Sequence, residues 1–169
     1  DLHSFPTRRS SDLWSYHTPA LAHQYGLTTV QVEHLLGRYG SLVREVLSLG
    51  ASDPALLAPI PGAPRYLLVE AVYAVTHEGA LHVADIIERR LRIAMEYGHR
   101  GVECAAPIAQ VVAPYLGWSA ADIAAEVDGY AATVAALLSA EQEVTDAGAN
   151  DMVVRVADPR GRIDVSQDR

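Results

Sequence analysis

Apolar residues recur at helical spacing over most of the chain between residues 28 and 138. The pattern is clearest in the segment after residue 119, where apolar positions alternate at spacings of four and three and so form one stripe on a long helix. The members of this stripe are Ile123, Val127, Tyr130, Val134 and Leu137. Ser119 and Asp122 stand three apart just before it, in the arrangement of a capping box. A long helix is therefore predicted to begin at residue 120.

Two shorter helices are predicted nearer the start. Thr28 or Thr29 can cap the first, and the glycines at 37 and 40 are expected to end it. Its apolar members are Val30, Val32, Leu35 and Leu36. Ser41 can cap the second, whose inward positions would be Leu42, Val43, Val46, Leu47 and Leu49. Two helices around a glycine-containing turn are also typical of a DNA-binding helix-turn-helix. We favour a helical hairpin in a core, because the second helix offers Arg44 as its only cation.

Three further helical segments are predicted in the middle of the chain. Residues 51–64 contain four prolines and read as a loop, with one helical turn after Asp53. Residues 66–75 are apolar nearly all round, which is typical of a buried central helix. Residues 82–97 form the next helical segment. Residues 102–116 form the last, and Pro107 and Pro114 are expected to shorten or kink it.

These patterns predict an all-α fold, a small orthogonal domain of about five to six helices with a disordered tail. Residues 14–27 lack a clear period and are expected to be a linker. The helical domain would then span residues 28–138. Periodicity fades from Ser139, and residues 139–169 are expected to be the helix end followed by a loose acidic tail.

The first thirteen residues are excluded from functional reasoning. His3 to Leu13 reads HSFPTRRSSDL, which is the translation of an oligonucleotide resembling a common sequencing adapter. The alternative is a basic, serine-rich arm or part of a targeting peptide. On the adapter interpretation Arg8 and Arg9 form no phosphate-binding patch, and Trp14 begins a fragment of a longer reading frame.

Charge and cysteine content narrow the class of protein further. The formal net charge is −8, and a general nucleic-acid binder would carry a basic surface, so no nucleic-acid partner is expected. Cys104 is the single cysteine, which rules out an internal disulfide and favours a reducing compartment, the cytoplasm. No apolar run is expected to be long enough to span a bilayer.

Candidate chemistry in the chain is weak. His77 and His82 stand five apart with Gly79 between them, whereas a zinc protease helix needs two histidines four apart. Cys104 near His99 could be a nucleophile, but a lone cysteine in an apolar helix is more often a core residue. The sequence holds no glycine-rich dinucleotide fingerprint and no phosphate-binding loop. We therefore predict no catalytic, cofactor-binding or metal-binding residue in this chain.

One long stretch, Val69 to Trp118, resembles a known family. Its matching features are Glu70-Ala-Val-Tyr73, Thr76-His-Glu-Gly-Ala-Leu-His82, Asp85, Arg89-Arg-Leu-Arg92, Glu96-Tyr-Gly-His-Arg-Gly-Val-Glu-Cys104 and Val112-Ala-Pro-Tyr-Leu-Gly-Trp118. Together with Leu35-Leu-Gly-Arg-Tyr-Gly40, they resemble the C-terminal domain of bacterial FAD-dependent glycerol-3-phosphate dehydrogenases and α-glycerophosphate oxidases. The resemblance covers roughly residues 25 to 138. Leu91 departs from the family pattern, which has threonine there, and so does Pro107.

The resemblance implies an oxidoreductase parent that converts sn-glycerol 3-phosphate to dihydroxyacetone phosphate and passes electrons through FAD to a quinone or to oxygen. The cofactor and phosphate sites of the family belong to the preceding FAD-binding domain, so this chain would be a non-catalytic cap that packs on that domain. The parent would act in the cytoplasm or peripherally on the inner face of the cytoplasmic membrane. The alternative is an independent helical interaction or DNA-binding module.

One polar cluster is singled out as a structural or interdomain element. Its members are Glu78, Asp85, Arg89, Arg90 and Arg92. The arginines could face a phosphate, a partner domain or anionic lipid. We favour pairing within the domain, because Asp85 and Arg89 are four apart and can meet on one helical face.

Overall fold

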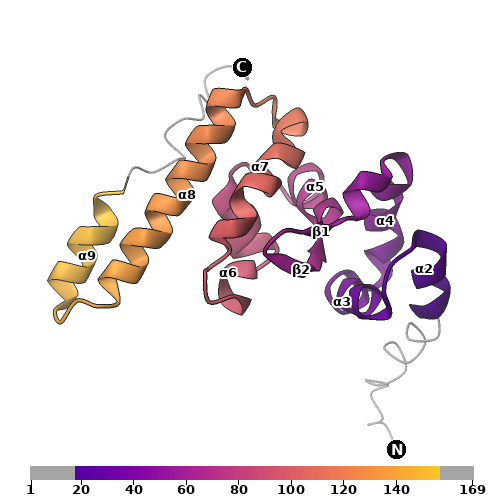
Figure 1. Ribbon diagram of the computed structural model, residues 1–169, viewed down its shortest axis with the longest axis horizontal. Coiled ribbons are helices and arrows are strands. Elements are labelled where there is room, and N and C mark those ends of the chain that lie inside the picture. Colours follow the sequence, from indigo (N-terminus) through magenta and orange to yellow (C-terminus); the bar gives the residue numbers. More distant parts are fainter. Residues whose placement is uncertain (1–17, 157–169) are drawn as a thin grey trace, which may run out of the picture. The chain divides into compact units, whose positions relative to one another are not determined.

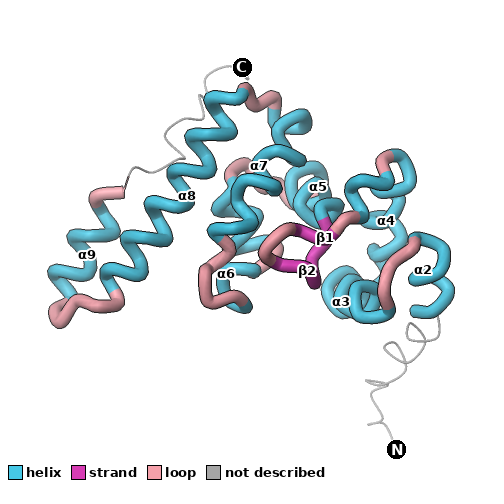
Figure 2. The backbone as a smooth tube through the Cα atoms, viewed as in Figure 1, coloured by secondary structure: helices cyan, strands magenta, loops and turns pink. Residues whose placement is uncertain are grey.

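The computed structural model describes residues 18–156, and this part of the chain is almost entirely helical (Figure 1). The prediction of an all-α fold is confirmed, although the described residues contain eight α-helices where about five to six were expected. One two-stranded sheet interrupts the helices (Figure 2). The α-helices are α2 (Thr18–Tyr25), α3 (Thr29–Tyr39), α4 (Val43–Ser52), α5 (Leu68–Thr76), α6 (Ile93–Glu96), α7 (Val102–Leu116), α8 (Ala120–Ala140) and α9 (Asp146–Val154). The excluded head, residues 1–13, lies outside the described residues.

The described residues form two compact units. The first comprises residues 18–60 and 64–70, and the second comprises residues 61–63 and 71–156. The division falls within α5, whose first three residues belong to the first unit. The sequence pattern gave no sign of this division.

The first unit packs α2, α3 and α4 around an apolar core. Its fully buried aliphatic side chains include Val32, Leu35, Val43, Val46 and Leu47. The predicted start of α3 is confirmed: the Thr28 hydroxyl accepts from the Gln31 amide and the Gln31 side chain accepts from the Thr28 amide. This reciprocal pair satisfies two amides that have no partner within the helix.

Three expectations for the first unit are wrong. Residues 18–25 were assigned to a linker because of Pro19, but they form α2, since a proline in the first turn removes no helical hydrogen bond. By contrast, the expected end of α3 between Gly37 and Gly40 is confirmed, because its last residue is Tyr39 and Gly40, with φ 54°, caps it. Ser41 does not cap α4, because a 3₁₀ turn, Gly40–Leu42, leads directly into it. Leu42, which was expected to face inward, is exposed, and so is Val30.

The proline-rich loop contains both an expected and an unexpected element. The helical turn after Asp53 is confirmed as a 3₁₀ helix, Pro54–Leu57, with the Asp53 carboxylate accepting from the Ala55 amide at 3.0 Å. Strands β1 (Pro59–Ile60) and β2 (Ala63–Leu67) then form a hairpin. The helix expected from residue 66 therefore begins at Leu68. Pro64 is tolerated because a two-stranded sheet has only edge strands.

The second unit is built on α7 and α8, which pack side by side (Figure 1). The capping box at the start of α8 is confirmed, with the Ser119 hydroxyl accepting from the Asp122 amide. On the predicted stripe, Tyr130 and Val134 are buried, while its other members are half-buried. The helix α7 continues past both Pro107 and Pro114, so the expected shortening does not occur.

The single helix expected over residues 82–97 is broken. It contains a π-helix, Asp85–Arg90, in which the Leu91 amide donates to the Ile86 carbonyl at 2.8 Å, five residues back. This spacing puts Ile86 and Leu91 on one face, and both are fully buried. Arg92 then adopts a left-handed conformation, with φ 62°, and the short helix α6 follows.

The C-terminal part corrects two further expectations. Residues 146–154 were assigned to a loose tail, but they form α9, which lies against α8 and is capped by Thr145. The remainder of the predicted tail, residues 157–169, lies outside the described residues. The helix α8 is also long and apolar enough to cross a membrane by length and composition, contrary to our expectation, although a core helix passes the same test.

Candidate functional site

The candidate site is the polar segment of the second unit from Glu78 to Arg100, which contains the predicted cluster. Asp85 and Arg89 form the expected pair, with the Arg89 guanidinium donating to the carboxylate at 2.6 Å. The second oxygen of Asp85 accepts from the amides of Leu81 and His82, at 3.3 and 3.2 Å. Asp85 therefore holds the first turn of the helical segment, as an acidic residue near a helix start does.

The other cluster members are placed differently. Arg90 donates through Nε to the Glu78 backbone carbonyl at 2.9 Å, which ties the π-helix to the loop after α5. The Glu78 carboxylate takes no part in this contact, and its Oε2 atom is buried without a hydrogen-bond partner in the described part of the chain. Arg92 is exposed and is not brought to the cluster. Four of the five predicted residues therefore form two separate contacts, Arg89 with Asp85 and Arg90 with the backbone of Glu78. Both contacts stabilise the fold.

Glu88 faces a groove that sequence reasoning did not identify. The groove has a volume of about 210 Å³ and is lined by Glu88, Ala94, Met95, Arg100, Val134 and Leu137. Burial raises the pKa of the Glu88 carboxyl, while the charges of Arg89 and Arg100 act in the opposite direction. Arg100 is itself fixed, because its guanidinium pairs with Glu141 and its carbonyl accepts from the Tyr130 hydroxyl at 2.5 Å.

A buried polar contact of the second unit joins His82 to Glu126. The His82 Nδ1 atom lies 2.9 Å from one carboxylate oxygen of Glu126, and the Val83 amide donates to the other at 3.1 Å. Both side chains are 7% exposed. The Nε2 atom of His82 is buried and has no hydrogen-bond partner among the described residues. Sequence reasoning missed Glu126, which lies between two members of the apolar stripe on α8.

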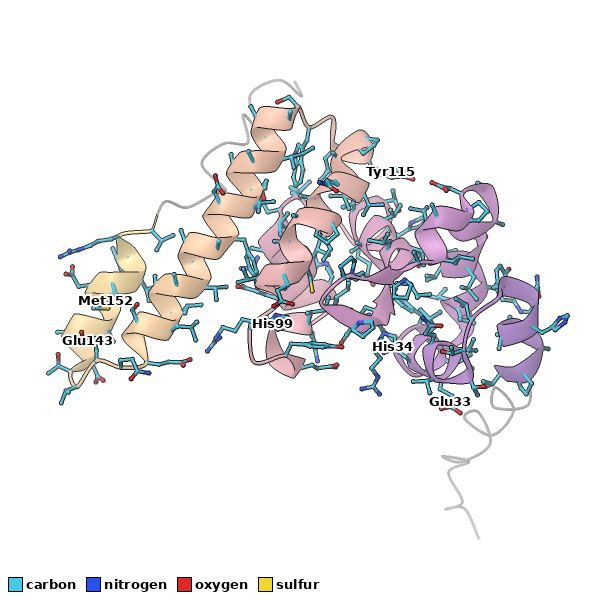
Figure 3. The ribbon with its side chains drawn as sticks, in the orientation of Figure 1. Glu33, His34, His99, Tyr115, Glu143 and Met152 are labelled. Carbon is cyan, nitrogen blue, oxygen red and sulfur yellow. The ribbon has the colours of Figure 1, made fainter. Side chains whose placement is uncertain are left out.

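A second buried carboxylate lies in the first unit. Glu70 is fully buried, and one of its oxygens accepts from the Leu67 amide at 2.8 Å, at the start of α5. The other oxygen lies 3.1 Å from His34 Nε2 and 3.9 Å from Arg38 Nε. The edge of the His34 ring meets the Tyr66 ring, with centroids 4.5 Å apart. Figure 3 shows His34 among the side chains of this unit. The sequence feature that could have indicated this site is Glu70 itself, the one acidic residue in an otherwise apolar helical segment.

The histidines and the cysteine considered for chemistry have other roles. His77 stacks on Tyr73, with ring centroids 4.4 Å apart. His99 accepts at Nδ1 from the Gly101 amide at 3.1 Å. Cys104 is fully buried, and burial raises the pKa of its thiol to about 11. Such a thiol is protonated near neutral pH and is a poor nucleophile. Within residues 18–156, no three metal-ligating side chains come together to hold an ion.

The helix-turn-helix interpretation gains no support from the first unit. The cation of α4, Arg44, is followed directly by Glu45, and both are exposed. Glu33 and Arg38 lie on α3, and Arg38 is directed to Glu70. A helix that reads DNA needs a basic face with several free cations.

The buried polar contacts of the described residues join helix ends to neighbouring helices. Within residues 18–156 these contacts do not combine a nucleophile with a base. The buried carboxylates of Glu70 and Glu126 are each held by an amide and a histidine.

Comparison with known proteins gives the family. The sequence profile described as the C-terminal domain of alpha-glycerophosphate oxidase matches residues 10–123. The proteins named glycerol-3-phosphate dehydrogenase 2 in Mycobacterium tuberculosis and in Mycobacterium bovis are each 51% identical to this chain over 140 residues, which is 83% of the chain and 24% of their own length. Glycerol-3-phosphate dehydrogenase of Mycobacterium leprae is 51% identical over 137 residues, or 81% of the chain and 23% of its own length.

No solved structure matches the chain. The chain spans about a quarter of the length of the curated relatives it matches. The profile covers the helices from α2 to the first turn of α8, with the polar segment inside it. The chain therefore belongs to the family defined by the C-terminal domain of alpha-glycerophosphate oxidase, to which the glycerol-3-phosphate dehydrogenases are related.

Proposed function

We propose that this chain serves as the C-terminal domain of an FAD-dependent glycerol-3-phosphate dehydrogenase. The parent would oxidise sn-glycerol 3-phosphate to dihydroxyacetone phosphate and pass the electrons to a quinone or to oxygen. The observation that carries the proposal is the 51% identity to mycobacterial glycerol-3-phosphate dehydrogenases over 83% of the chain. The profile match over residues 10–123 includes the cap at Thr28, the π-helix and Glu70.

The described residues do not fit FAD themselves. FAD is held through its pyrophosphate at a glycine-rich turn between a strand and a helix, and the β2-to-α5 junction passes directly from Leu67 to Leu68 without a glycine. The groove of about 210 Å³ beside Glu88 is also smaller than pockets for drug-sized ligands, which span roughly 300–1,000 Å³. We therefore place FAD and glycerol 3-phosphate in the FAD-binding part of the parent, which would be the partner of this domain.

The role left to this domain is support. The parent's flavin, when bound, supplies the redox chemistry, while rigid helices hold a neighbouring domain in place. The buried contacts of Glu70 and Glu126 suit such a role because they fix helix positions without being available to a substrate. We further propose that the parent acts in the cytoplasm or peripherally on the inner face of its membrane. The support is that the one cysteine of the chain, Cys104, is free, as is usual in a reducing compartment.

Two experiments test the proposal. Extending the genomic reading frame upstream of Trp14 should reveal an FAD-binding domain, and an upstream frame without one would defeat the proposal. A fluorescence titration of the isolated chain with FAD should give no tight binding. Saturable binding at low micromolar FAD would contradict the placement of the cofactor outside this domain.

A further inference from the structure

The groove between α6 and α8 combines apolar walls with two charged groups (Figure 1). Its four apolar lining residues come from these two helices and are Ala94, Met95, Val134 and Leu137. The other two lining residues are Glu88, from the π-helix, and Arg100, from the loop before α7. Apolar walls with a few convergent polar groups are typical of sites that bind small molecules.

The Glu88 carboxylate is the first group in the groove that a ligand could satisfy. It is half-buried, and within residues 18–156 it accepts no hydrogen bond and forms no close ion pair. Burial raises the pKa of this carboxyl, because removal of water disfavours its charged form. A cationic donor beside Glu88 would replace the lost water and favour the charged form. The ammonium group of a ligand is a donor of this kind.

The Arg100 guanidinium is the second group. It meets Glu141 through its Nη2 atom, and a guanidinium carries five N–H donors, so its other nitrogens can bind a second carboxylate. The backbone of Arg100 is fixed, because its carbonyl accepts from the Tyr130 hydroxyl at 2.5 Å. Arg100 acts on Glu88 through its charge, but the two form no direct ion pair in the described part of the chain. A ligand can therefore lie between them.

The size of the groove and its two opposite charges define the ligand. Its volume of about 210 Å³ is below the roughly 300–1,000 Å³ of sites for drug-sized molecules. We propose that the groove binds a free α-amino acid with an aliphatic side chain, such as leucine. Its ammonium group would pair with Glu88, its carboxylate with Arg100, and its side chain would pack against the four apolar residues. This inference does not depend on the proposed function, because it concerns only the second unit.

Titration of the isotope-labelled 169-residue chain with L-leucine, followed by heteronuclear NMR, tests the proposal. The backbone amide signals of Ala94, Met95 and Val134 should shift and saturate with a Kd of about 1 mM or tighter, as expected for so small a ligand. The amide signals of the first unit, such as that of Leu35, should not move. An absence of saturation at about tenfold this concentration, or shifts confined to residues outside the groove, would overturn the proposal.

Three analogues of leucine test its three contacts without changing the protein. Isocaproate lacks the ammonium group, isopentylamine lacks the carboxylate, and glycine lacks the aliphatic side chain. Each should bind about tenfold or more weakly than L-leucine, because each leaves one part of the groove without its partner. If any of the three binds as tightly as leucine, the corresponding contact is not made and the proposal is refuted.

A matched pair of variants tests the role of Glu88. Glu88→Gln keeps the size of the side chain but removes its charge, and it should raise the Kd for L-leucine about tenfold or more. Glu96→Gln makes the same change at an exposed residue of α6 that does not line the groove, and it should leave the Kd unchanged. Equal Kd values for the two variants would show that Glu88 does not bind the ammonium group and would overturn the proposal.

Discussion

Two glutamates, Glu70 and Glu126, are buried in this chain in the same way. Each gives one carboxylate oxygen to a backbone amide at the start of a helical segment and the other to a histidine. Burying a carboxylate is costly unless its oxygens are satisfied, and these two donors supply the compensation. Neither pair could be predicted from local patterns, because the partners His34 and His82 stand 36 and 44 residues away in sequence.

Removing the Glu126 carboxylate should destabilise the second unit. Glu126→Ala leaves the His82 Nδ1–H and the Val83 amide without acceptors, which should lower the free energy of unfolding by about 2–4 kcal/mol. Urea denaturation followed by circular dichroism measures this loss. Asp128→Ala, an exposed change two residues further along α8, should stay within about 0.5 kcal/mol of the wild type. A loss as small as that for Glu126→Ala would mean that the pair does not hold the helix.

The Cys104 thiol should titrate late in the folded protein. Burial raises its pKa from 9.0 to about 11. The unfolded chain loses this proton first, so the stability contributed by the thiol is complete below pH 9 and declines as the pH rises from 9 towards 11. Alkylation by iodoacetamide should therefore show a midpoint near pH 11 in the folded chain and near pH 9 in urea. Equal midpoints in the two states would contradict the burial of this side chain.

At the scale of elements, the junction between the π-helix and α7 is closed by one glycine. Gly101 has φ +77°, and a Cβ atom there would lie 2.6 Å from Ile87 Cγ2 and 3.1 Å from Ile93 Cγ2. Both isoleucines are fully buried, so neither can move away easily. The loop after α6 can therefore approach the π-helix only because residue 101 has no side chain.

Replacing this glycine should be costly where a nearby glycine is not. Gly101→Ala combines left-handed strain with a clash in the core and should lower the free energy of unfolding by about 2–3 kcal/mol. Gly98→Ala has open space around its new methyl group and should change stability by less than about 1 kcal/mol. Thermal melts of the two variants compare them directly. Equal melting temperatures would show that the loop does not pack as described.

The elements that could be predicted are those specified by neighbouring residues. The capping boxes at Thr28 and Ser119 need only residues three apart, and the apolar stripe of α8 is a local period. The hairpin of β1 and β2 was missed because its short strands carry prolines. The π-helix was missed because its hydrogen bonds span five residues, which interrupts the usual helical period. The helix α9 has only Thr145 as a start signal and buries none of its residues.

The candidate site shows the same limit. Asp85 and Arg89 meet because they are four apart on one helical segment, which the sequence states directly. Arg90 reaches a backbone carbonyl twelve residues away, which no side-chain pattern records. Arg92 leaves the cluster because the chain turns left-handed at that residue. Spacing along the sequence predicted the pair of Asp85 and Arg89, but it did not predict that Arg92 lies apart from the cluster.

At the scale of the whole molecule, the described chain consists of two helical units, each of which buries one glutamate beside a histidine. Its family supplies the functional context, since its relatives are glycerol-3-phosphate dehydrogenases of which the matched residues make up 24%. We expect this chain to replace the C-terminal quarter of these relatives without loss of their function. A domain that only supports its neighbour should be exchangeable at 51% identity, because the interior positions that fix helix packing tolerate similar residues.

A domain exchange tests this claim most directly. Residues 14–156 would replace the matching C-terminal segment of glycerol-3-phosphate dehydrogenase 2 of Mycobacterium tuberculosis, and the chimera would be assayed for FAD content and for dye-coupled oxidation of glycerol 3-phosphate. The same enzyme truncated before that segment serves as the control. The chimera should bind FAD and retain turnover within about tenfold of the parent enzyme, while the truncated form should not. A chimera that folds and binds FAD but turns over no faster than the truncated form would contradict the assignment.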